Sequence, residues 1–333
     1  METPLILLVV VVALTLVFDF INGFHDTANA IATVVSTRAL KPLTAVVYAG
    51  ILNFAGAMMG TEVAATIGKG LVNAAAISLH TVLCTVVAAI VWNLITWYRG
   101  LPTSSSHAVI GSLLGATFFS SAAGGDNILW MALVQKVLIP MVASPVLGLT
   151  IGLAIMVLLT WMIYRLHPAF INRLFGRLQI LSAGFMAINH GRNDAQKSMG
   201  IIALALVLAH PAQGFEVPLW VKLACAVAMG LGTMTGGWRI IRTLGSKMIK
   251  LQTVQGFAAE TTASIIIGSA SHFGIPVSTT HVITTSIMGV GATNRLSAVR
   301  WGVVGNIVWA WILTIPLTFL LAGGLMAVYR NFI

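Results

Sequence analysis

Long apolar segments alternate with short polar loops along the whole chain of 333 residues. A helix needs about 20 predominantly apolar residues to cross the hydrocarbon core of a bilayer. By this measure the pattern predicts an all-α membrane protein with about ten crossings. We place them at residues 4–36 (with an interruption), 43–60, 77–98, 101–123, 138–164, 178–207, 220–236, 254–270, 276–292 and 301–328.

The composition agrees with lipid as the main solvent of the surface. Hydrophobic residues make up 58% of the chain and charged residues only 8%, with a mean hydropathy of +0.96. A soluble domain carries roughly 25% charged residues. The net charge of +10 resides in short loops and forms no basic stripe with interleaved aromatics, so we expect a bilayer and no nucleic acid as partner.

Basic residues follow every odd-numbered crossing and predict the orientation. Cytoplasmic loops collect Lys and Arg, so these loops are predicted to be cytoplasmic and both termini extracytoplasmic, in a multi-pass protein of the cell inner membrane. The opposite loops hold Glu62 with Lys69, Asp126, Glu216 and His272. The basic residues are Arg38, Lys41, Arg99, Arg165, His167, Arg173, Arg177, Arg239, Arg242, Lys247, Lys250, Arg295 and Arg300.

The two halves of the chain resemble each other. Gly23 and Asp26 recur as Gly191 and Asp194, 168 residues later. We therefore predict an N-terminal repeat at 1–164, a short basic cytoplasmic linker at 165–177 and a C-terminal repeat at 178–333. Five crossings in each half give the second half the opposite insertion. Inverted repeats are typical of secondary transporters with broken or half helices at the midplane, and Gly23 and Gly191 are expected to open their helices there.

Asp26 and Asp194 lie inside apolar segments. An ionised carboxylate at the bilayer centre costs about 2.5–3.5 kcal/mol even on the lenient insertion scale. Binding of a cation or proton explains their presence, and a buried hydrogen-bond network is the alternative. Amides nearby could ligate a cation, donate to an oxyanion, or simply join helices. They are Asn22, Asn29, Asn189, Asn193 and Gln196.

Two matching blocks form a second element, Pro-Thr-Ser-Ser-Ser-His at 102–107 and Pro-Val-Ser-Thr-Thr-His at 276–281. Proline suits the first turn of a helix, and the following N–H groups and hydroxyls can bind an anion. Two such helix starts facing each other could surround a tetrahedral oxyanion such as phosphate. The plainer alternative is a pair of ordinary N-capped helices.

Other buried ionisable residues leave several roles open. His107 and His281 could share a proton or hydrogen-bond to a neighbouring helix. Lys197 takes the place that Asn29 holds in the first half, and could replace a bound cation or pair with Asp194. Glu260 could belong to the coupling path or pair with a basic residue. Arg192 could neutralise the anion or pair with Asp194.

Nearly the whole chain resembles the inorganic phosphate transporter (Pit) family. The motifs that carry the resemblance are Gly-Phe-His-Asp-Thr-Ala-Asn-Ala at 23–30, Gly-Arg-Asn-Asp-Ala-Gln-Lys at 191–197 and the two Ser/Thr blocks. The resemblance implies phosphate symport by alternating access. Phosphate would then bind at Ser104, Ser105, Ser106, Ser278, Thr279, Thr280 and Asn193. Cation or proton coupling would involve Asn22, Asp26, Asn29, Asn189, Asp194, Lys197 and Glu260.

Two departures from the sodium-coupled pattern favour H⁺ over Na⁺ as the coupling ion. His25 replaces the Asn of the first motif, and Lys197 replaces that of the second. The pattern is closer to the bacterial low-affinity, proton-coupled members, for which the resemblance implies transport of a neutral metal-phosphate complex. A Na⁺-coupled phosphate symporter and a sulfate symporter are the alternatives within the family.

Outside the family, an anion channel and an intramembrane Ser/His hydrolase are the competing classes. No serine stands in a nucleophile-elbow motif, so we expect no catalytic residue and no enzyme activity. Cys84 and Cys225 form no ligand spacing, and we expect no cofactor and no metal ligands. A homodimer is one of the assemblies that the sequence leaves open.

Overall fold

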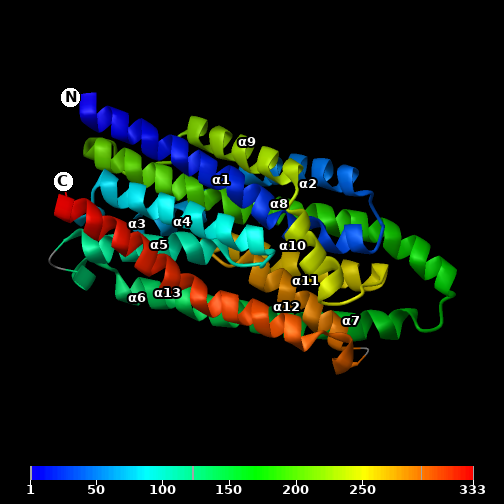
Figure 1. The fold of residues 1–333 in the computed structure, drawn as a ribbon. Coiled ribbons are helices and arrows are strands. Elements are labelled where there is room, and N and C mark those ends of the chain that lie inside the picture. Colours follow the sequence, from blue (N-terminus) through cyan, green and yellow to red (C-terminus); the bar gives the residue numbers. More distant parts are fainter. Residues whose placement is uncertain (1, 122–123, 294, 333) are drawn as a thin grey trace.

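The described residues 2–121, 124–293 and 295–332 of the computed structural model are helical and contain no β-strand. Most helices run side by side along one long axis, and the N- and C-termini lie at the same end (Figure 1). The helices are α1 Glu2–Ser36, α2 Pro42–Ala57, α3 Glu62–Lys69, α4 Leu79–Arg99, α5 Ser105–Ser120, α6 Trp130–Leu133, α7 Ile139–Ile163, α8 Pro168–Ala209, α9 Leu219–Thr235, α10 Trp238–Arg242, α11 Thr253–His272, α12 Thr279–Ala292 and α13 Trp301–Phe332.

The predicted all-helical membrane fold is confirmed. Among the described residues, four continuous helical stretches are long and apolar enough to span a bilayer, and the number rises to six if each of two bent pairs is one span. The bent pairs are α2 with α3, at 70°, and α9 with α10, at 56°. Large apolar side chains such as Leu43, Trp161 and Phe185 are 63–79% exposed on the outside, which suits contact with lipid. The number of ten crossings remains a prediction.

The expected opening of the helices at Gly23 and Gly191 is wrong. Both α1 and α8 continue through these glycines without a break. A Cβ at Gly23 would lie 2.5 Å from the carbonyl oxygen of Met229 on α9, and one at Gly191 would overlap that of Asn53 on α2. The glycines thus allow close helix packing. The half helices are instead α5 and α12, with 16 and 14 residues, each preceded by an extended segment.

The close contacts of the two halves are reciprocal. The first helix of each half packs on the second helix of the other, since Gly23 meets α9 and Gly191 meets α2. Further along the same interfaces, Gly232 of α9 meets the backbone of Phe20 and Gly56 of α2 meets that of Ile188. Phe20 and Ile188 are again 168 residues apart. The repeats are therefore intertwined at their centre and share one interior.

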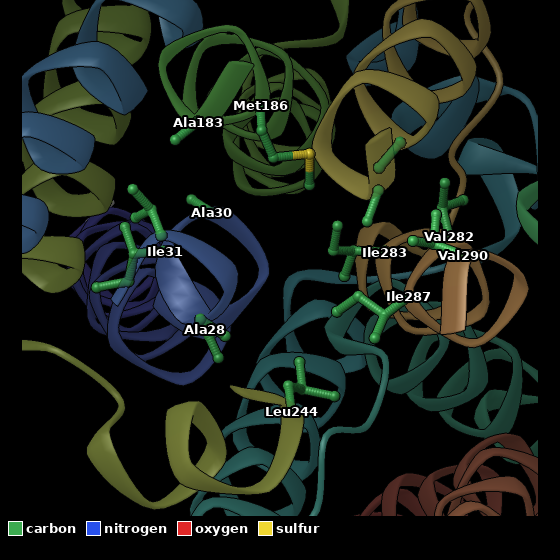
Figure 2. Packing of buried hydrophobic residues seen from close by; sticks show 14 of the residues in the cluster. Ala28, Ala30, Ile31, Ala183, Met186, Leu244, Val282, Ile283, Ile287 and Val290 are labelled. Atoms are coloured by element: carbon green, nitrogen blue, oxygen red, sulfur yellow. The ribbon is translucent and has the colours of Figure 1, made fainter. Parts of the chain in front are cut away.

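A buried apolar cluster surrounds the middle of α1, α8 and α12. Met186 of α8 and Ile283 of α12 project into the space beside α1, and Ile31 of α1 belongs to the same cluster (Figure 2). Leu244, in a π-helical turn after α10, closes it from another side. This packing fixes the helices that carry the polar residues described below. Because α8 begins at Pro168, most of the segment 165–177 is helical, and its role as a linker between repeats remains a prediction.

Candidate functional site

One face of α1 carries a line of buried polar side chains. Asp19, Asn22, Asp26, Asn29 and Thr33 follow at intervals of three, four, three and four residues, and each is at most 2% exposed. Residues at such intervals lie on the same face of an α-helix. The line therefore runs along the inside of a helix whose other positions are mostly apolar.

Asp26 lies at the centre of this line, and both of its carboxylate oxygens are engaged. His25 Nδ1 lies 2.6 Å from Asp26 Oδ1, and Ser105 Oγ at the start of α5 donates to Oδ2 at 3.0 Å. The other ring nitrogen of His25 lies 3.0 Å from the Thr96 hydroxyl on α4. The carboxylate is thus oriented by groups from α1, α4 and α5.

Asp194 of α8 has the corresponding place in the second half. Lys197 Nζ lies 2.7 Å from Asp194 Oδ1, and His190 Nε2 lies 3.5 Å from Oδ2. Thr279 at the start of α12 donates to Oδ2 at 3.4 Å, as Ser105 donates to Asp26. His190 is itself oriented by Asn53 of α2, with 2.8 Å between Nδ1 and Oδ1.

The two aspartates meet in the middle of the molecule. Asp26, His190 and Asp194 each offer one ligand atom, and these atoms lie within 4.8 Å of one another. Two carboxylates and one ammonium, on Lys197, give this buried cluster one negative charge when the imidazoles are neutral. A proton or a small cation would balance it, since an uncompensated charge in an apolar interior is costly.

Both Ser/Thr blocks begin helices beside this cluster. Ser104 Oγ accepts a hydrogen bond from His107 N and caps α5, and Ser278 Oγ accepts one from His281 N and caps α12, at 3.2 Å in both cases. Asn29 of α1 donates to both hydroxyls of the second block, at 3.2 Å to Thr279 and 2.9 Å to Thr280. Helix starts from the two halves thus converge where an anion would be attracted.

Several buried polar atoms around the cluster make no hydrogen bond among the described residues. A buried polar group without a partner costs about 1–3 kcal/mol, so such atoms usually mark a place for water, an ion or a ligand. They include the amide nitrogen and oxygen of Asn22, the amide oxygens of Asn29 and Asn193, and the Thr103 hydroxyl. The site has unused capacity to bind a polar species.

Comparison with known proteins agrees with this arrangement. Residues 22–322 match the model of the phosphate transporter family, which includes both aspartates and both Ser/Thr blocks. This chain belongs to the phosphate transporter family. The match to a single family along most of the chain confirms the resemblance identified from the motifs.

Curated relatives of this phosphate transporter family member align along its full length. A probable low-affinity inorganic phosphate transporter of Rhizobium meliloti (strain 1021) is 45% identical over 95% of this chain and 94% of its own length. One of Bacillus subtilis (strain 168) is 44% identical over 96% of both chains. A solved structure titled "The sodium-dependent phosphate transporter" has a TM-score of 0.90 at 24% identity, covers 98% of this chain and all of its own, and shows the shared fold.

Two of the residues expected to take part in coupling lie outside the central cluster. Asn189 is half-buried and donates to the carbonyl of Phe185 in its own helix, while His190 takes the inward position. Glu260 of α11 is fully buried in a separate cluster, where Thr33 and Ser182 donate to its carboxylate. No basic side chain pairs with Glu260 in the part of the chain that the structure describes, which disagrees with an ion-pair role.

The remaining expected residues line or border the cluster. Asn193 donates to Ser271 of α11 at 2.9 Å, and Ser106 donates to the carbonyl of Val277 at 3.1 Å, across the two halves. Lys197 pairs with Asp194, one of its two expected roles. The rings of His107 and His281 touch edge to face, with 4.7 Å between centroids.

Sequence reasoning missed His190, Thr96, Asn53 and Asp19. His190 and Asn53 could not be found from the repeat, because their contact joins helices that are far apart in sequence. Asp19 was missed because the corresponding position in the second half is Ala187. Its burial in the first apolar segment was the signal that could have found it.

Proposed function

We propose that this protein is a secondary active symporter that carries inorganic phosphate across the cell inner membrane, coupled to H⁺. One observation carries the proposal, namely that paired aspartates and paired helix starts from the two halves of the chain meet in one buried cluster. Sites of this kind, between inverted repeats, are typical of transporters that work by alternating access. Relatives named as inorganic phosphate transporters support phosphate as the substrate.

Phosphate suits the donors that surround the cluster. Its four oxygens could accept from the Thr280 hydroxyl, from those of Ser105, Ser106 and Thr279 once these release their present acceptors, and from N–H groups at the starts of α5 and α12. The amide of Asn193 is a further donor at the edge. The acidic cluster must be neutralised before a dianion can bind next to it, so the anion and the coupling ion are expected to bind together.

The coupling ion is proposed to be H⁺ because an ammonium already stands beside Asp194. Lys197 Nζ lies 2.7 Å from the carboxylate, and its positive charge is expected to repel Na⁺ from this side of Asp194. His25 and His190 supply two further groups that can hold protons. The sodium-dependent protein of the same fold makes Na⁺ coupling the alternative to be tested.

A basic cavity lies near the C-terminal end of α1. It has a volume of about 550 Å³, and its lining includes Ala32, three residues after Asn29. Its cationic lining residues are Arg99, Arg239, Arg242 and Lys247. A cavity lined by one sign of charge concentrates counter-ions, so phosphate is expected to enter or leave here.

Uptake of radiolabelled phosphate into proteoliposomes tests the proposal. Uptake driven by an imposed pH gradient and unaffected by a Na⁺ gradient is expected, and sulfate in excess should not compete. Uptake driven only by Na⁺ would contradict H⁺ as the coupling ion. Uptake of sulfate alone would contradict phosphate as the substrate. Repeating the assay with and without Mg²⁺ tests whether phosphate travels as a metal complex.

The same vesicles distinguish the competing classes. A channel would equilibrate phosphate without responding to a proton gradient and would conduct current in a planar bilayer. The tight pairing of both aspartates favours coupled transport over a channel. The transporter names of the relatives favour transport over hydrolysis, and labelling by a serine-reactive probe would argue for the hydrolase.

A further inference from the structure

Asp19 has an unusual environment among the buried acids of this protein. Asp26, Asp194 and Glu260 each have at least two polar partners. The side chain of Asp19 is 0% exposed, and neither of its oxygens makes a hydrogen bond within the described residues. The nearest donors to Asp19 are the Ser198 hydroxyl and the Cys225 thiol, and among the described residues it has no cationic partner such as the one that Lys197 gives Asp194.

The position of Asp19 connects it to the central site. It precedes Asp26 by seven residues on the same face of α1, which corresponds to about 10 Å along the helix axis. Asn22, whose amide is also without a partner, lies between them. Because α1 begins at Glu2, Asp19 lies on the side of Asp26 toward the end that carries both termini (Figure 1).

Few charged or titratable groups face Asp19. They are Lys197 and Asp194 of α8, and Cys225 of α9, with the Ser198 hydroxyl as a further polar neighbour. Ser198 Oγ is itself buried and without a partner. These groups provide too few oxygens to enclose a metal ion, which takes several oxygen ligands. A proton needs only one carboxylate oxygen.

From this geometry we propose that Asp19 is a proton-binding residue on the path between the terminus-bearing side of the membrane and the Asp26–Asp194 cluster. An ionised carboxylate without a partner is costly at this depth, whereas the protonated acid is neutral. In this step a hydronium ion from the terminus-bearing side gives its proton to the Asp19 carboxylate and leaves as water. The acid then passes the proton toward the cluster and returns to its ionised form. The inference rests on the proposed proton-coupled function.

Asp19→Asn separates proton handling from phosphate binding. Asparagine imitates the protonated acid in shape and charge, so the loaded protein can still change conformation, but it cannot release a proton. We expect pH-driven net uptake to fall by about tenfold or more, while phosphate–phosphate exchange at equal pH on both sides stays within about twofold of wild type. Asp19→Glu keeps an acid and is expected to restore net uptake.

Matched controls make the result decisive. Asp126→Asn removes an exposed carboxylate from a loop and should leave both assays unchanged. The melting temperature of Asp19→Asn should stay close to that of wild type, because the amide oxygen can still accept from the Ser198 hydroxyl and the variant breaks no ion pair of the described residues. Normal pH-driven uptake by Asp19→Asn would overturn the inference. Joint loss of uptake and exchange, or failure of Glu to rescue, would do so as well.

Assays of the wild-type protein distinguish a failure of the proposed transport function from a failure of the role assigned to Asp19. Wild type that shows no phosphate exchange would refute the proposed function itself. Wild type that exchanges phosphate but accumulates it only with Na⁺ would refute the proton path and Asp19 with it. Proton-driven wild-type uptake with an unaffected Asp19→Asn variant would refute Asp19 alone.

Discussion

At the scale of single residues, the paired aspartates support the sharpest prediction. Asp26→Asn and Asp194→Asn remove the charge that a coupling proton must neutralise, while an amide of the same size keeps the packing. Each variant is expected to abolish pH-driven phosphate uptake in proteoliposomes and still to elute from a sizing column like wild type, although Asp194→Asn leaves Lys197 unpaired and should also lower the melting temperature. Uptake at the wild-type rate by both variants would contradict the coupling role.

Replacing Lys197 tests whether its ammonium group keeps Na⁺ out of the site. Lys197→Asn introduces the residue type that Asn29 supplies in the first half and leaves Asp194 without its ammonium. Removing one member of a buried ion pair costs about 3–5 kcal/mol, so the melting temperature should fall in choline chloride. In NaCl the cation can take the vacant place and restore part of the loss. Equal melting temperatures of the variant in the two salts would argue against this explanation.

The sequence predicted many of the site residues, but not which side chains of a helix point toward the site. The repeat identified Asp26, Asp194 and the Ser/Thr blocks, and the structure brings them together. It did not distinguish Asn189 from His190, because adjacent residues on a helix point about 100° apart and the inward face depends on packing. The roles of these residues in transport remain predictions.

At the scale of helices, the prediction that failed was the opening of α1 and α8 at Gly23 and Gly191. A glycine in an apolar helix is equally consistent with a break and with a close contact, and only the neighbouring helix decides between them. At Gly191 the neighbour is the backbone of Asn53. The helix starts at Ser104 and Ser278 were easier to predict, because capping depends on local sequence.

Helix α8 provides a matched pair of glycines to test this point. A Cβ at Gly191 meets the Asn53 backbone, whereas one at Gly176 has no neighbour within 4 Å. Gly191→Ala is expected to destabilise the protein by about 1–3 kcal/mol through overpacking. Gly176→Ala should be neutral or stabilise it by up to about 1 kcal/mol through helix propensity. Thermal unfolding in detergent measures both, and an equal response would contradict the packing argument.

At the scale of the whole molecule, charge predicts the orientation. In a variant without Cys84 and Cys225, single cysteines at Asp126→Cys and Lys250→Cys are both exposed but lie in loops of opposite type. An impermeant maleimide added to intact cells should label the first and should reach the second only after the membrane is opened. The reverse pattern would invert the proposed topology.

The reciprocal packing of the two halves also affects how the protein can be made. The first helix of the early half rests on α8 and α9, which leave the ribosome only after most of the chain has been synthesised. Until then the acidic side chains of α1 lack the helices that bury them, and they must remain exposed to lipid or to the insertion machinery. A nascent chain truncated before α8 should therefore be a target for proteolysis, and stable assembly should begin only when the second half arrives.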